Sequence, residues 1–145
     1  MTPGQHSDGG RRALQITLGT LACIPFASGL AGMLVGPRSL PGDRSRVEPS
    51  LDNEYRYTHA VWFAAAPVIW SALPQVERQA PVLRAVCATV TLGGLARVLS
   101  WRKSGRPHPV LVGATALELG IPALLLWQRR VAERVGQHPL AGPRR

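Results

Sequence analysis

The chain has 145 residues and a mass of 15.6 kDa, which suits one domain and excludes a large multi-domain enzyme. Lys and Arg total 17 against 8 for Asp and Glu, so the formal net charge is +9. The apolar residues lie in long runs with charges between them, which excludes a disordered basic protein, and two cysteines exclude a disulfide-rich secreted scaffold. A small polytopic membrane protein is the class that remains.

Taken in chain order, the sequence divides into two tails and one apolar domain. Residues 1–12 are polar and rich in glycine, which predicts a disordered N-terminal tail. Residues 13–131 contain four apolar runs and are predicted to form one transmembrane domain. Residues 132–145 predict a flexible basic C-terminal tail.

The four runs predict membrane-spanning helices at about 13–36, 57–76, 81–101 and 109–128. A spanning helix needs about 20 mostly apolar residues, and the first two runs carry no charge over 24 and 20 residues. The third run reaches this length only if Arg84 extends to one interface and Arg97 lies inside the membrane. The fourth run carries one acid, Glu118, near its middle.

Two other interpretations of these runs remain open. They could be buried helices of a soluble protein, although the first two runs lack the polar face that such helices repeat at the helical period. The first run could instead be a cleaved secretory signal, because an arginine pair precedes it and the small residues at 27–29 imitate a cleavage site.

Short links between the later runs predict an all-α fold, an antiparallel up-and-down bundle of four transmembrane helices. Both termini then lie on the same side of the membrane. That side carries nine basic residues and the opposite side seven, with Arg97 left out as membrane-embedded. The small excess favours cytoplasmic termini.

Small residues allow close backbone approach between membrane helices and so predict the contact faces. They are Ser28, Gly32 and Gly36 on the first helix, Gly93 and Gly94 on the third, and Ala116 and Gly120 on the fourth. Three helices are also expected to kink at a proline, namely at Pro25, Pro67 and Pro122.

A candidate polar cluster lies at one membrane face. Its members are Asp52, Glu54, Tyr55, Arg56, Arg97, Ser100 and Glu118. At 1.5 Å per residue, Arg97 lies roughly 7 Å and Glu118 roughly 13 Å below that face, and a lone charge at such depth needs a partner. We therefore predict an Arg97–Glu118 pair, which either serves function or fixes helix register. The charges at 52–56 are also consistent with a simple interfacial cap before a helix.

Other chemistry is sparse in the sequence. The histidines are scattered and the two cysteines stand alone, so neither a metal site nor a cofactor is predicted. Neither a phosphate-binding loop nor a nucleophile elbow occurs, and we do not expect an enzyme. Because the arginines flank apolar runs, anionic lipid head groups are the expected counter-charge and nucleic acid is not an expected partner.

A family resemblance rests on four motifs. They are LDNEYRYTHAVWF, LGGLARVLSWRKSGRPHP, the acid within ALELGIP, and LLLWQRR. From about Leu14 to Arg130 the chain resembles the DUF4345 family, small bacterial four-helix membrane proteins without an assigned activity. The resemblance implies an uncharacterised integral protein of a bacterial inner membrane and adds no mechanism.

Three functions follow as hypotheses. The first is a binding or assembly module whose polar face meets a lipid head group, a protein partner or a second copy of the chain. The alternative is a small transporter or proton-linked component in which Glu118 and Arg97 line a path. The third is a membrane enzyme built on the polar cluster. A hydrated tunnel to Glu118 would favour transport, and a closed pocket ringed by polar residues would favour binding or catalysis.

Overall fold

The computed structural model describes residues 3–42 and 46–136, and all regular structure within them is helical. The elements are α1 (Pro3–Val35), η1 (Gly36–Ser39), α2 (Pro49–Ala72), η2 (Leu73–Gln75), α3 (Ala80–Ser104), α4 (Pro109–Gly120) and α5 (Ala123–Gly136), where η marks a 3-10 helix. Because α4 and α5 together occupy the fourth apolar run, the predicted all-α bundle of four antiparallel helical segments is confirmed.

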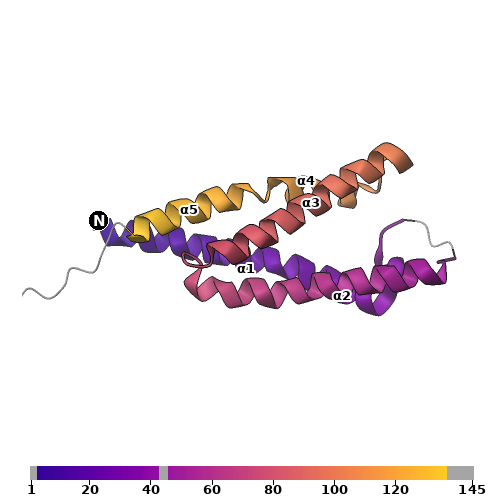
Figure 1. Ribbon diagram of the computed structural model, residues 1–145, viewed down its shortest axis with the longest axis horizontal. Helices are drawn as coiled ribbons and strands as arrows, with labels where there is room; N and C mark the ends of the chain where they lie inside the picture. Colours follow the sequence, from indigo (N-terminus) through magenta and orange to yellow (C-terminus); the bar gives the residue numbers. More distant parts are fainter. Residues whose placement is uncertain (1–2, 43–45, 137–145) are drawn as a thin grey trace, which may run out of the picture.

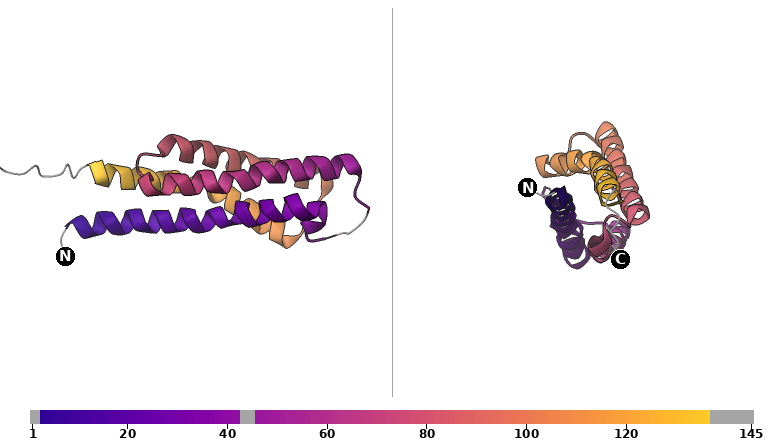
Figure 2. Two further views of the ribbon diagram at one scale, coloured as in Figure 1. Left: turned by 90° about the horizontal axis from the view of Figure 1, so that it is seen from below. Right: turned by 90° about the vertical axis from the view of Figure 1, so that its left-hand side faces the viewer.

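The helices form two layers (Figures 1 and 2). α1 and α2 run antiparallel and pack against each other more extensively than any other pair. α3 runs antiparallel to α4 and α5, and these three make the second layer. The beginning of α1 and the end of α5 share one end of the bundle, which we call the tail end. The opposite end holds residues 36–42, 46–48 and 105–108, and we call it the loop end.

Prolines and caps define where the helices start and stop. The carboxylate of Glu48 accepts a hydrogen bond from the backbone N–H of Leu51 at 3.0 Å, and Pro49 follows as a residue without a donor to satisfy. At the start of α4 the Nδ1 atom of His108 accepts from Val110 in the same way. α3 ends at Gly105, whose φ of +89° is a conformation that other residues rarely adopt.

Several predicted boundaries differ from the structure. α1 begins at Pro3, so the predicted disordered tail is helical from that residue onward, because a helix already nucleated by a long run extends at low cost. The predicted basic tail at 132–145 is helical to Gly136, and its remainder lies outside the described residues. Of the three prolines expected to kink helices, Pro25 and Pro67 lie within continuous helices, whereas Pro122 interrupts the fourth segment.

The apolar core lies toward the tail end, where both layers meet. It consists of Leu14, Leu18, Ala22, Ile69, Val76, Leu83 and Val131, contributed by α1, α2, α3, α5 and the turn after η2. Trp70 packs on this cluster and donates a hydrogen bond from Nε1 to the carbonyl of Gly19 at 3.1 Å. The two layers are therefore fixed to each other mainly at this end.

Three segments are long and apolar enough to cross a membrane by length and composition. They are Gly9–Ser39, Ala80–Ser104 and Pro109–Gly136. α2 is not among them, because Tyr57, His59 and two tryptophans make it less apolar. The prediction of membrane-spanning helices is thus supported for three segments, and the second span stays a prediction.

The α1–α2 contact depends on glycines of α1. A Cβ atom at Gly29 would lie 2.6 Å from the backbone nitrogen of Phe63, and one at Gly32 would overlap the ring of His59. Gly32 and Gly36 were predicted for this face, whereas Gly29 was missed. Ser28 is exposed, but its hydroxyl accepts a hydrogen bond from Nε1 of Trp62 at 3.1 Å.

The predicted small-residue faces of the second layer are only partly right. Gly94 packs against α4, since a Cβ there would lie 3.1 Å from the Cβ of Glu118, whereas Gly93 is exposed. On the fourth segment the prediction is wrong, because Ala116 and Gly120 are both exposed. The buried side of α4 instead carries Thr115, whose hydroxyl bonds to the carbonyl four residues earlier.

Candidate functional site

Five of the seven residues of the predicted polar cluster form two groups at the loop end. Asp52, Tyr55 and Arg56 lie on α2 beside the end of α1, whereas Arg97 and Glu118 join α3 to α4. The two layers diverge here, as Figure 1 shows at the right-hand ends of α2 and α3. Within the described part of the chain, no hydrogen bond or ion pair connects the two groups.

Arg56 closes the C-terminal end of α1. Its Nε donates to Oδ2 of Asp52 at 2.7 Å, and its Nη1 donates to the carbonyls of Met33 and Leu34 at 2.8 and 3.0 Å. The hydrogen bond that Arg56 donates to Asp52 raises the pKa of Arg56 further above its usual range, so the guanidinium stays charged. Because the last carbonyls of a helix lack internal partners, the group acts as an interhelical cap. The cap lies at the end of α1, whereas the sequence interpretation placed it at the start of the second helix.

The other predicted cluster members have local roles or no side-chain partner. Tyr55 stacks on His59 with ring centroids 3.9 Å apart, and its hydroxyl lies 3.1 Å from Oγ of Ser39. Glu54 and Ser100 are exposed, and neither side chain makes an ion pair or hydrogen bond to another described residue. Tyr55 thus packs against its own helix, and Glu54 and Ser100 lie on the surfaces of α2 and α3.

Arg97 and Glu118 form the predicted pair. Nε of Arg97 lies 3.0 Å from Oε2 of Glu118 and donates its hydrogen to Oε1 at 3.2 Å. The Glu118 side chain is 13% exposed and that of Arg97 is 42% exposed, so the carboxylate is enclosed while the guanidinium reaches the surface. Gly94, one turn before Arg97, lets α4 approach closely enough for this contact.

One oxygen of this pair has no hydrogen-bond donor. Arg97 Nε carries a single hydrogen, which is directed at Oε1, so Oε2 has only an electrostatic contact. Oε2 is buried and accepts no hydrogen bond from any described residue. A buried polar atom without a partner is costly, so Oε2 is a candidate acceptor for a hydrogen bond from a bound group. Thr91 Oγ1 is in the same condition but does not line the cavity described next.

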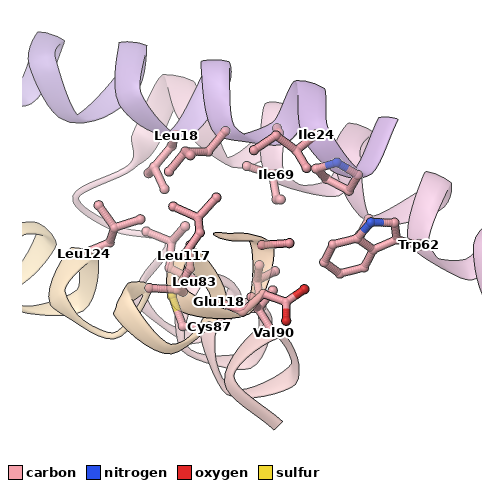
Figure 3. A pocket seen from close by; sticks show the side chains of 17 residues that line it. Leu18, Ile24, Trp62, Ile69, Leu83, Cys87, Val90, Leu117, Glu118 and Leu124 are labelled. Atoms are coloured by element: carbon pink, nitrogen blue, oxygen red, sulfur yellow. The ribbon is translucent and has the colours of Figure 1, made fainter. Parts of the chain in front are cut away.

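A cavity of about 100 Å³ lies between the two layers, and we call it the interlayer cavity. All five α-helices contribute to its wall, which includes Leu18, Ile24, Trp62, Leu83, Glu118 and Leu124. Leu18 and Leu124 close it toward the core, while the Glu118 carboxylate points toward Trp62 at the other end (Figure 3). Glu118 is the one charged residue of this wall within the described chain. The arrangement is neither a polar tunnel nor a pocket ringed by Asp52 and Glu54.

Sequence reasoning missed a polar network at the tail end. Arg11 pairs with Glu77 at 3.0 Å and donates to the carbonyl of Pro74, and Gln15 donates to the carbonyl of Leu73 at 2.7 Å. From α5, the buried Gln128 donates to the carbonyls of residues 76 and 77 at 3.2 and 3.3 Å. These bonds tie α1, the turn after α2 and α5 together. A lone glutamine within an apolar run was the available signal.

Metal-binding and thiol chemistry have little support in the described residues. No group of three His, Cys, Asp or Glu side chains there is arranged to hold a metal ion. Cys23 is exposed, whereas Cys87 is buried and lines the interlayer cavity. The two cysteines are not bonded to each other.

Comparison with known proteins identifies one family. A family model described as Domain of unknown function (DUF4345) matches residues 13–128, which cover α2, α3 and α4 in full and parts of α1 and α5. No curated protein and no solved structure matches the chain.

Proposed function

Because the chain belongs to the DUF4345 family, a domain of unknown function, we propose that it is a binding module, a small multi-pass membrane protein that holds an apolar ligand between its two helix layers. The observation that carries this proposal is the interlayer cavity, to which all five α-helices contribute. Apolar surroundings with one convergent polar group are typical of small-molecule sites.

The distribution of packing supports a cavity that is held open. Membrane helices associate through close van der Waals contact, so a void between them forfeits attraction. Here the core cluster and the Gln128 bonds fix the layers at the tail end, while the layers diverge at the loop end. A ligand between the layers would restore the missing contacts, and it could enter past Trp62 and Glu118.

We place the protein in a bacterial cell membrane with four spans and cytoplasmic termini. For α2, the support is its extensive contact with α1, which is itself apolar enough to cross. Single cysteines in place of Ser39 and Gln79 test this span, because the two positions flank α2 at opposite ends. Labelling from opposite sides of the membrane is expected, and labelling from one side would contradict a crossing α2. An active cytoplasmic reporter fused at Arg145 tests the orientation.

The outer surface of the protein is expected to contact lipids. Arg102, Lys103 and Arg106 are exposed at the loop end and suit anionic head groups. A protein partner or a second copy of the chain would contact the same outer surfaces, and we propose neither catalysis nor a cofactor. A proton-linked role for Glu118 would require hydration of the cavity, and proton flux in proteoliposomes that depends on Glu118 would favour it over binding.

Fluorescence quenching of Trp62 tests the proposed function. In lipid nanodiscs, 4-bromotoluene serves as a ring-sized apolar quencher, and the difference between wild type and Trp62→Phe isolates the signal of Trp62. We expect saturable quenching that Ala114→Leu abolishes, because Ala114 lines the cavity. Ala116→Leu is the matched control, since Ala116 is exposed on the same helix. Quenching that never saturates and is equal in all variants would refute a binding cavity.

A further inference from the structure

We infer that the ligand is an uncharged molecule with an apolar body and one hydroxyl group, and that this hydroxyl donates a hydrogen bond to Oε2 of Glu118. The inference rests on the proposed function and specifies the ligand's chemical class. Three independent features of the interlayer cavity lead to it: an unsatisfied acceptor, a neutral ion pair and a limited volume.

The acceptor requires a donor. Oε2 is buried and receives no hydrogen bond, although Glu118 forms part of the cavity wall. An ionised carboxylate can only accept hydrogen bonds, so the missing partner carries an O–H or N–H group. Every other described residue of the wall offers apolar side-chain surface, apart from the indole of Trp62 and the thiol of Cys87. The indole N–H of Trp62 is already donated to Ser28.

The ion pair selects for an uncharged ligand. Arg97 and Glu118 neutralise each other, so the site has no net charge to balance an ionic group. An additional charge in these apolar surroundings would remain uncompensated, which is strongly unfavourable. A hydroxyl group provides the donor that Oε2 lacks without adding charge.

The volume limits what the enclosed part of the ligand can be. A cavity of about 100 Å³ is somewhat smaller than an engineered apolar cavity of roughly 150 Å³ that binds benzene. The enclosed part of the ligand is therefore at most one ring or a short branched chain, and any longer tail must extend past Trp62 toward the lipid. Since Leu18 and Leu124 close the inner end, the hydroxyl group lies near Glu118 and the apolar body points toward the core.

Four matched probes separate these features. They are 4-bromobenzyl alcohol, 4-bromotoluene, 4-bromobenzylamine and 4-bromobenzoate, which share a brominated ring and differ in the attached group. Affinities are measured by quenching of Trp62 in nanodiscs at neutral pH and are corrected for partitioning into protein-free nanodiscs. We expect the alcohol to bind about tenfold more tightly than 4-bromotoluene, the size of effect that one hydrogen bond to a charged acceptor gives. The charged probes should bind more weakly than the alcohol.

Variants then assign the preference to Glu118. Arg97→Met/Glu118→Met removes both charges together and leaves no lone buried ion, so it should fold. The alcohol and 4-bromotoluene should bind this variant about equally. Glu118→Gln is the second variant, and it retains an acceptor oxygen, so part of the alcohol preference should remain.

The outcomes distinguish this inference from the proposed function. If the alcohol and 4-bromotoluene bind wild type equally and Ala114→Leu blocks both, the cavity binds ligands but Oε2 is satisfied by water, and the hydroxyl inference is wrong. Tighter binding of the amine or the benzoate would also overturn it. If no probe quenches Trp62 saturably, both proposals fail.

Discussion

Removing one member of the Arg97–Glu118 pair should destabilise the bundle by an amount that depends on which partner is removed. Arg97→Met leaves a carboxylate that is only 13% exposed without its cation, which should cost about 3–5 kcal/mol. Glu118→Met leaves Arg97, which is 42% exposed and can extend its side chain toward the loop end, so we expect about 1–3 kcal/mol. The asymmetry follows from the different enclosure of the two groups.

The double variant should be less destabilised than the sum of the two single losses. With both charges replaced by methionine, no uncompensated ion remains, and the coupling energy should be about 1–3 kcal/mol. The assay is reversible unfolding of the four proteins in mixed micelles, with the free energy of unfolding extrapolated to the non-denaturing condition. Two single losses that simply add, or a greater loss for Glu118→Met than for Arg97→Met, would refute the reasoning.

Three further predictions concern packing, buried hydrogen bonds and pH. Gly29→Ala should destabilise the protein by about 1–3 kcal/mol, because its Cβ would meet backbone atoms of α2. Gly93→Ala, which meets nothing within 4 Å, should cause no loss in the same unfolding assay. Gln128→Leu should cost about 1–3 kcal/mol, because it leaves two carbonyls at the tail end without their donor. Hydrogen bonds from Ser50 and Leu51 lower the pKa of Glu48, so its cap stabilises the start of α2 above the ordinary glutamate pKa and is lost as the pH falls through the lowered value. A smaller protection factor for the Leu51 amide in acid, with the exchange rate taken relative to its intrinsic rate at each pH, checks this, and Glu48→Gln should not show the change.

The helical architecture could be predicted because it depends on local properties of the sequence. Apolar runs bounded by charges indicate the four segments, and each segment must satisfy its own backbone in a membrane. The Arg97–Glu118 pair could also be predicted, because each residue is a lone charge at a similar depth in its own helix. With one membrane-embedded cation in the third apolar run and one acid in the fourth, only one pairing was possible.

The cavity and the division of the polar cluster depend on helix rotation and on angles between helices, which the apolar runs do not encode. Residues 52–56 and 97–118 share one end of the bundle, yet the layers diverge there and keep them apart. Helix rotation also explains the error on α4, where Thr115 is buried instead of Ala116. The charges at 52–56 were interpreted as a cap before their own helix, whereas Arg56 reaches the carbonyls of Met33 and Leu34 at the end of α1.

The central claim is that the interlayer cavity holds an uncharged ligand, and native mass spectrometry of protein released from its own membrane tests it most directly. Wild type and Ala116→Leu should each retain one small neutral molecule of the same mass. Ala114→Leu should lose that molecule, because its side chain fills the cavity that Ala114 lines. Wild type without any bound molecule, or the same bound molecule in all three proteins, would contradict the account.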